Sequence, residues 1–165
     1  LKGSFCVPGD MALENWDQAV GDALRAELEA GDWNARREIL ERLGRCKAAR
    51  CDATAVSLAQ GQLQHSECHV RRAAMSALVR LSGAGDENVA DRRGPALDVA
   101  VSSALLLLED EDWGVRRMAL DALPEIVPRG IDAPLTCIIA HLGDEDDDVR
   151  GAAVRALGKL APLGN

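Results

Sequence analysis

Four stretches of this 165-residue chain share one pattern, in which an acidic residue is followed three positions later by an apolar residue and then by arginine. The arginines of the four stretches are Arg36, Arg71, Arg116 and Arg150, and the matching acids are Asp32, Glu67, Asp112 and Asp146. Neighbouring arginines are 35, 45 and 34 residues apart. Self-similarity at a period of this size indicates an array built by stacking one structural unit several times.

A helix with one apolar face follows each of the last three arginine motifs. After Val115, for example, the apolar residues are Met118, Ala119, Ala122, Leu123 and Ile126. This spacing of three and four residues places all of them on one side of an α-helix. The acid before each helix is suited to cap it, because its carboxylate can accept from free N–H groups in the first turn.

Weaker stripes of apolar residues at helical spacing lie between these motif helices. They cover residues 13–28, 56–63, 97–108 and 135–142, the third opened by Gly94-Pro95 and the fourth by Asp132 and Pro134. Proline is tolerated in the first turn of a helix. Aromatic residues make up only 2% of the chain, so its core must consist of Ala, Leu, Val and Ile, which favours closely packed helices. We therefore predict an all-α solenoid of eight helices in four hairpins.

The pattern acid-x-x-Val-Arg-x-x-Ala-x-x-Ala-Leu resembles the HEAT repeat, in the form found in HEAT-like proteins of the phycobilisome-lyase type. The resemblance covers residues 12–163, with repeats at about 12–47, 48–82, 95–128 and 131–162. Residues 1–11 are then an N-terminal extension, and 82–94 (SGAGDENVADRRG from Ser82) is a polar insertion, either a tolerated surface loop or a binding loop.

The resemblance implies a right-handed superhelix with the motif helices on its concave side. It also implies that each motif arginine links neighbouring repeats through an acidic partner. The candidate partners are the motif acids Asp32, Glu67, Asp112 and Asp146.

Two features of the turns before the motif helices are candidate protein-binding sites. Trp33 and Trp113 occupy the same motif position, where they either anchor a partner or cover the turn of the hairpin. Acidic residues cluster on two equivalent turns, either as a docking surface for a basic partner or as helix caps that also favour solubility. These clusters are Asp110, Glu111 and Asp112, and Asp144, Glu145, Asp146, Asp147 and Asp148.

The two ends of the predicted array differ in polarity. Repeat one carries Glu38 and Arg42 where later repeats have small apolar residues, as expected for an end that meets solvent. The last helix carries Val154 on a wider apolar arc than one neighbour can cover. We therefore expect the C-terminal face to be covered by a partner or by missing repeats.

Charge and composition exclude several functions. A net charge of −8 disfavours nucleic acid and anionic membranes as partners, and no apolar run reaches the length of a membrane span. Five scattered cysteines and three histidines show no metal-ligand spacing, so we expect no metal or cofactor. Most cysteines are read as small apolar residues of a protein in a reducing, intracellular compartment.

The sequence favours a protein-interaction module, a subunit of a larger assembly, over an enzyme. No nucleophile–base constellation can be assembled from its histidines. No histidine is followed by glutamate, which HEAT-based hydroxylases require. The alternative is a HEAT-type chromophore (bilin) lyase or another HEAT-based enzyme, since the lyases have no sharp motif to test.

Overall fold

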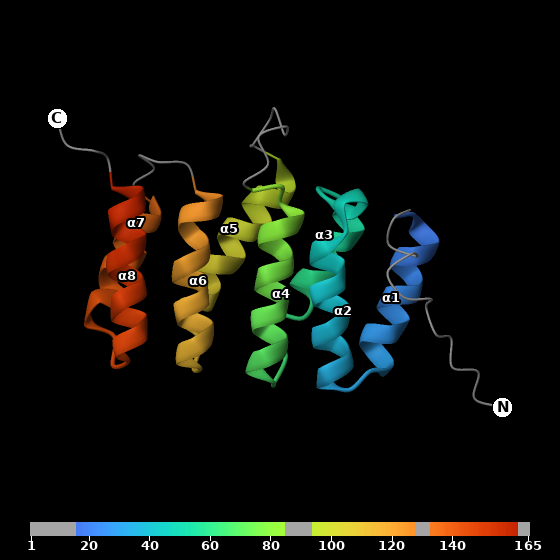
Figure 1. The fold of residues 1–165 in the computed structure, drawn as a ribbon, viewed down its shortest axis with the longest axis horizontal. Coiled ribbons are helices and arrows are strands. Elements are labelled where there is room, and N and C mark those ends of the chain that lie inside the picture. Colours follow the sequence, from blue (N-terminus) through green and yellow to red (C-terminus); the bar gives the residue numbers. More distant parts are fainter. Residues whose placement is uncertain (1–15, 85–93, 128–132, 162–165) are drawn as a thin grey trace.

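The computed structural model describes residues 16–84, 94–127 and 133–161, and within them helices are the only regular secondary structure (Figure 1). These residues form eight α-helices and two short 3₁₀ helices. The first half contains α1 (Gln18–Ala30), α2 (Trp33–Arg45), η2 (Lys47–Ala49), α3 (Ala53–Gln60) and α4 (Cys68–Leu81). The second half contains α5 (Pro95–Leu107), α6 (Trp113–Ile126), α7 (Ala133–Ala140), η3 (His141–Gly143) and α8 (Asp147–Leu160).

The helices pack as sequential hairpins in two layers. The motif helices α2, α4, α6 and α8 run side by side in chain order, and each packs against the next (Figure 1). Helices α3, α5 and α7 lie behind them, and α1 stands at the N-terminal end. The predicted all-α array of helical hairpins is confirmed.

Aspartates start most of the motif helices, as the sequence predicts. Asp32, Asp112 and Asp146 are N-caps whose side chains accept from backbone N–H groups two or three residues later. Glu67 occupies the N-cap position of α4, but its side chain makes no capping bond. Its longer side chain is a poorer cap than aspartate.

A single hydrophobic core runs through the described part of the chain, from Leu24 to Leu160. Small residues bring the motif helices close together. A Cβ added to Gly44 in α2 would lie 3.0 Å from the Cα of Ala77 in α4. The low aromatic content therefore reflects helices that touch almost backbone to backbone.

One expected helix position needs correction, and other expectations lie wholly or mostly outside the described residues. The four described cysteines are free thiols: Cys46 is buried, Cys68 is half-buried, and Cys51 and Cys137 are exposed. Leu63 lies in the turn after α3 and not on the helix. The limits of the repeat domain, the cap at Asp132 and most of the 82–94 insertion lie outside the described ranges.

Replacing Gly44 by alanine tests the close approach of α2 and α4. Alanine is the better helix former by about 1 kcal/mol, but its methyl group would press on Ala77. We expect Gly44→Ala to lower the free energy of unfolding by about 1 kcal/mol. Gly158→Ala is the control, because nothing lies within 4 Å of its added Cβ, and it should stabilise by about 0.5–1 kcal/mol. Equal stabilisation of both variants in urea unfolding would contradict the close packing.

Candidate functional site

Arg71, near the start of α4, joins two successive repeats. Its Nη1 donates to the carbonyl oxygens of His65 and Ser66, at 2.8 and 3.0 Å, in the turn before its own helix. Its Nε and Nη2 donate to the two carboxylate oxygens of Asp110, at 2.8 and 2.6 Å, in the next repeat. Both side chains are less than a tenth exposed. We call this double set of bonds the arginine bridge.

Arg116 makes the same arginine bridge one repeat later. Its Nη1 donates to the carbonyls of Asp110 and Glu111, and its Nε and Nη2 each donate to Asp144 at 2.9 Å. A planar guanidinium donating twice to one carboxylate is among the strongest ion-pair geometries. These hydrogen bonds raise the pKa of Arg116, and they hold the pKa of Asp144 below its ordinary value of 3.8.

The acids of the arginine bridges are not the motif acids. We expected Asp32, Glu67, Asp112 and Asp146, but the bonded carboxylates are Asp110 and Asp144, each two residues before a helix cap. Each also accepts from the backbone N–H of the cap residue, which fixes its orientation. The Asp-x-Asp spacing in both acidic clusters was the available signal, since it separates the bridging carboxylate from the capping one.

The first and last motif arginines make incomplete bridges. Arg36 donates to the carbonyls of Gly31 and Glu29, but it reaches the neutral Gln62 at 3.2 Å instead of a carboxylate. Arg150 donates to the carbonyls of Asp144 and Glu145 at 2.7 and 3.1 Å, and its Nη2 contacts the exposed Asp147 of its own turn.

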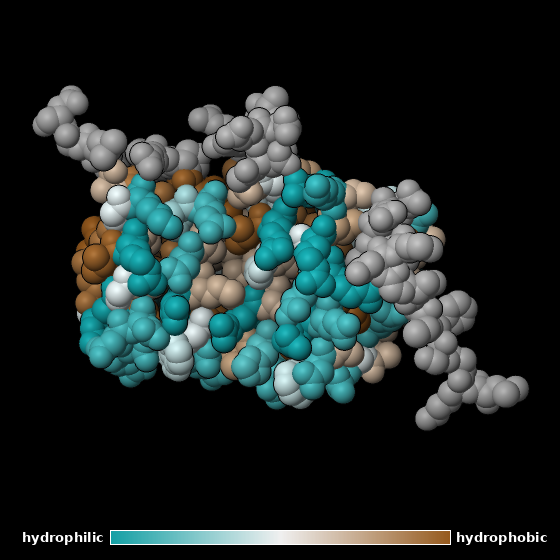
Figure 2. Space-filling model, viewed as in Figure 1, coloured by the Kyte–Doolittle hydropathy of each residue, from teal (hydrophilic) through white to brown (hydrophobic). Residues whose placement is uncertain are grey.

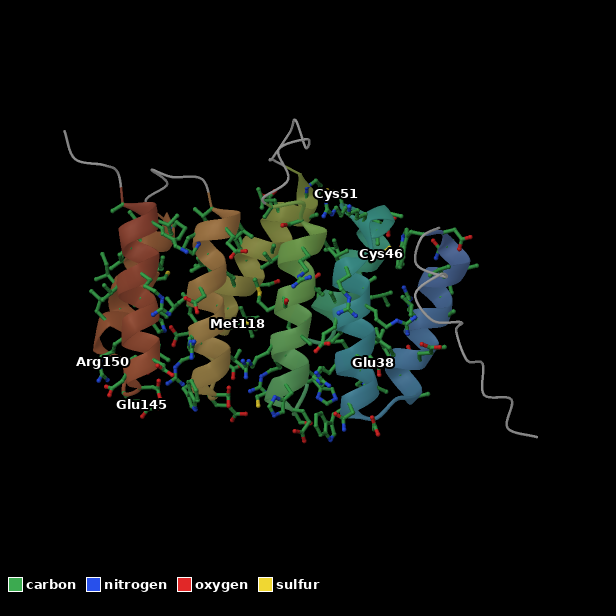
Figure 3. All side chains as sticks on the ribbon, in the orientation of Figure 1. Glu38, Cys46, Cys51, Met118, Glu145 and Arg150 are labelled. Carbon is green, nitrogen blue, oxygen red and sulfur yellow. The ribbon has the colours of Figure 1, made fainter. Side chains whose placement is uncertain are left out.

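Exposed acidic and aromatic side chains mark the turns before the motif helices, and we call them the turn edge. Glu111 and Glu145 occupy equivalent turns and are each 86% exposed. Figure 3 labels Glu145 in the turn before α8. Trp113 is nearly half exposed at the start of α6. Trp33 instead stacks on His69, with ring centroids 5.8 Å apart, so it packs against the next repeat. The turn edge thus contains acids that take no part in capping.

A second surface, the end face, comprises Leu142, Arg150, Val154 and Leu157 of the last repeat. Val154 is 61% exposed, whereas the residues at the same position of the preceding repeats, Leu40, Met75 and Leu120, are fully buried. Hydrophobic residues gather at this end of the molecule, beside α7 and α8 (Figure 2). The sequence prediction of an uncovered apolar arc at Val154 is confirmed.

Leu142 extends the end face onto the turn after α7. It is 40% exposed, while its equivalents Leu63 and Leu108 are 4% and 1% exposed. Leu142 was expected only as the last residue of the apolar stripe 135–142 and not as part of a site. Offsetting the last two repeats by the 34 residues that separate their arginines would have aligned it with Leu108.

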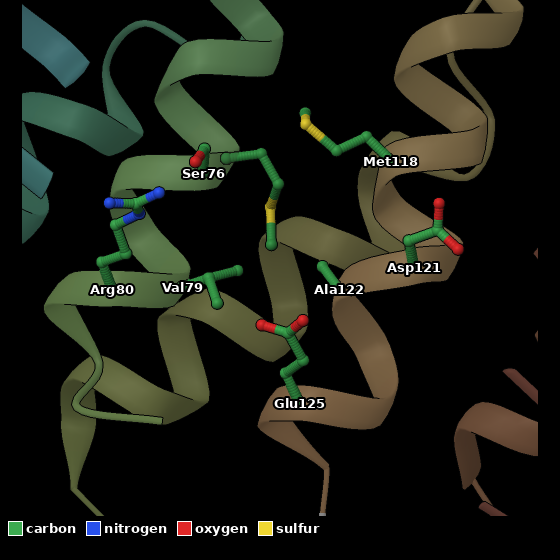
Figure 4. Close-up of a pocket in the computed structure, with 8 residues that line it drawn as sticks. Ser76, Val79, Arg80, Met118, Asp121, Ala122 and Glu125 are labelled. Carbon is green, nitrogen blue, oxygen red and sulfur yellow. The ribbon is translucent and has the colours of Figure 1, made fainter. Parts of the chain in front are cut away.

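A groove of about 260 Å³ lies between α4 and α6 on the layer of motif helices (Figure 4). Met118 and Ala122 line it from α6, with Val79 from α4. Arg80 stands on one side and Glu125 on the other. Side chains of both signs surround the groove, so its charge favours no particular class of ligand.

Removing Arg116 should break the arginine bridge and leave Asp144 buried without its partner. We expect Arg116→Ala to lower the free energy of unfolding by about 2–4 kcal/mol. Arg117→Ala is the control, since Arg117 is 43% exposed, and it should cost less than about 0.5 kcal/mol. Chemical denaturation measures both, and equal costs would show that the bridge contributes nothing.

The bridge also predicts a pH dependence. Because the pKa of Asp144 is lowered in the folded chain, its contribution is present above the unfolded pKa and lost as the pH falls through the folded pKa. Asp144→Asn should therefore destabilise most near neutral pH and progressively less below about pH 4. Urea unfolding across this range tests it, with the exposed Glu125→Gln as control, since Glu145 itself contacts Arg116. A cost that is independent of pH would contradict the assignment.

The comparisons with known proteins support the repeat architecture. Residues 101–164 match the family model described as HEAT repeats. No curated protein matches the chain. The crystal structure of an engineered protein from the Northeast Structural Genomics Consortium is similar, with a TM-score of 0.59 and 21% sequence identity.

The similarity to the engineered protein covers 86% of this chain and 62% of that one, so the present chain spans less than two thirds of its length. At this identity the match bears on the fold alone. It agrees with an all-α array of sequential hairpins, and no helix within the described ranges is long and apolar enough to cross a membrane. Residues 101–164 therefore carry HEAT repeats, and the eight described helices form an array consistent with a HEAT α-solenoid.

Proposed function

We propose that this chain is a protein-binding module, a scaffold subunit of a larger assembly, and that its end face is covered by a partner protein. HEAT repeats are typically protein-interaction scaffolds, which supports the general class. The observation that carries the proposal is Val154, which is 61% exposed at a position that is fully buried in all three preceding repeats. Exposed apolar surface of this kind marks interaction sites.

The first repeat supports this proposal, because it carries polar residues at positions where the next repeat has small apolar ones. In α2, Glu38 is exposed and Arg42 is half-buried (Figure 3 labels Glu38). Their equivalents in α4, Ala73 and Ala77, are buried. A terminal repeat that needs no partner takes polar residues on its outer side. The last repeat has instead kept an apolar residue there.

The turn edge is a second candidate surface, suited to a basic segment. Glu111 and Glu145 stand exposed on equivalent turns, and Trp113 lies between these turns in the sequence. A lysine or arginine of a partner gains from nearby carboxylates and from the face of an exposed indole. Trp33 is the weaker anchor, because its ring already stacks on His69.

The proposal assigns binding to this chain and not catalysis. Each of the three histidines has a structural contact: His65 accepts from the N–H of Glu67, and His69 stacks on Trp33. His141 is buried between the carbonyl oxygens of Cys137 and Leu108, both at 2.8 Å. The alternative, a bilin lyase or other HEAT-based enzyme, predicts visible absorbance from pigment bound to the purified chain.

Val154→Glu tests the end face directly. A carboxylate there should prevent an apolar partner surface from docking, so recovery of the partner in affinity capture from the source cells should fall at least about tenfold. Lys159→Glu is the control, because it also adds negative charge to α8 but lies outside the end face. Its equivalents in the preceding repeats, Arg80 and Glu125, line the groove instead. Unchanged recovery with Val154→Glu would refute the proposal.

The same capture separates the turn edge from the end face. If a basic segment binds at the edge, Trp113→Ala should weaken recovery, and added salt should weaken it further. Trp33→Ala is the comparison residue. If both substitutions reduce partner recovery equally and added salt has no effect, the turn edge does not bind the partner and serves only as a turn.

A further inference from the structure

A second groove on the layer of motif helices, of about 280 Å³, lies between the C-terminal halves of α2 and α4. Arg45 of α2 and Arg80 of α4 both border it, and both side chains are exposed. The stem of Arg80 reaches across to α2, because its Cδ would lie 3.4 Å from a Cβ added to Gly44. Figure 4 labels Arg80 and Ser76, which also lines this groove. We call it the two-arginine groove.

The charge of the two arginines is not neutralised by an ion pair. Within the described ranges neither Arg45 nor Arg80 bonds a carboxylate. Glu41 also borders the two-arginine groove, but it is bonded to Arg37 of its own helix at 2.7 Å. In the next repeat the position of Glu41 is taken by the uncharged Ser76.

The junction of α6 and α8 places opposite charges where the two-arginine groove has like ones. The positions of the two arginines are occupied there by Glu125 and Lys159. One turn earlier in the same helices, Arg155 bonds Asp121 across the junction at 3.0 Å. Two neighbouring cations repel each other, so the pair in the two-arginine groove does not arise from what packing of the helices requires.

The helix dipoles do not account for the two arginines either. Arg45 and Arg80 lie in the last turns of α2 and α4, where a cation interacts favourably with the helix dipole. The same position of α6, however, carries Glu125. The array therefore folds with an anion at this position as well as with a cation.

The two-arginine groove lies in a basic part of an acidic chain. Residues 33–81 carry nine Lys and Arg against four Asp and Glu, although the whole chain has a net charge of −8. This distribution attracts a short anionic segment to α2 and α4 and repels it from the other helices. A long polyanion such as a nucleic acid would meet Asp121 and Glu125 on the next motif helix.

We propose that the two-arginine groove binds an acidic segment of a partner protein, whose carboxylates lie between Arg45 and Arg80. Carboxylates accept strong hydrogen bonds from guanidinium groups. The hydroxyl of the half-buried Ser76 supplies a further donor in the same groove. This surface is separate from the end face, so the inference does not depend on the function proposed for that face.

A defined peptide tests the two-arginine groove. A fluorescent peptide of six glutamates is titrated with the full chain at low ionic strength, and its anisotropy is measured against a peptide of six glutamines. Arg45→Gln and Arg80→Gln should each weaken binding of the glutamate peptide at least about fivefold. Arg72→Gln is the matched control, since Arg72 is an exposed arginine of α4 outside the groove, and it should change the affinity less than about twofold.

Ser76→Asp tests the same inference from within the chain. It introduces the acid that α6 carries at this position, Asp121, beside two unpaired arginines. The midpoint of urea unfolding should rise, because the new carboxylate neutralises them. Affinity for the glutamate peptide should fall at least about fivefold, because that carboxylate then competes with the peptide.

Three results would overturn the inference. The first is a glutamate peptide that does not bind, or that binds Arg45→Gln and Arg80→Gln as tightly as the unaltered chain. The second is an unchanged affinity in Ser76→Asp. The third is tighter binding of a single-stranded oligonucleotide of six thymidines, which would assign the groove to phosphates of nucleic acid. Val154→Glu should leave the affinity for the peptide unchanged within about twofold, so this inference and the proposed function can fail separately.

Discussion

The array depends on an arginine that belongs to two repeats at once. Arg71 and Arg116 hold the turn before their own helix through backbone carbonyls and hold the next repeat through a bidentate carboxylate. A buried guanidinium is unfavourable unless its donors are satisfied. Here one side chain makes at least four hydrogen bonds, and they are available only when both repeats are in register. The apolar core packs any two helices together, but the arginine selects one relative position.

The helical hairpins could be predicted because their signals are local. The spacing of three and four residues after Val115 and the capping aspartates Asp112 and Asp146 lie within single helices or turns. The partner of each arginine could not be predicted in the same way. Whether Arg116 reaches Asp144 or the cap Asp146 depends on how far one hairpin is displaced from the next, and that displacement is set by packing between repeats.

The candidate surfaces could likewise be predicted from the sequence only where their signals are local. The exposure of Val154 could be predicted, because the apolar arc of the last described helix is wider than the helices packed against it can cover. The ring contact of Trp33 could not, because it depends on His69 of another repeat; Trp33 and Trp113 are otherwise similarly exposed, at 40% and 46%. The acidic clusters likewise divide into capping, bridging and exposed carboxylates only once neighbouring turns are placed side by side.

Each internal repeat contains both an aspartate and an arginine of the arginine bridge, so a duplicated repeat could form a new junction by itself. A hairpin such as residues 95–127 carries the aspartate that serves the repeat before it and the arginine that serves the repeat after it. A duplicated gene segment of this length would therefore bring both halves of a new junction with it. Arrays of this kind can lengthen or shorten by recombination without a new contact having to evolve.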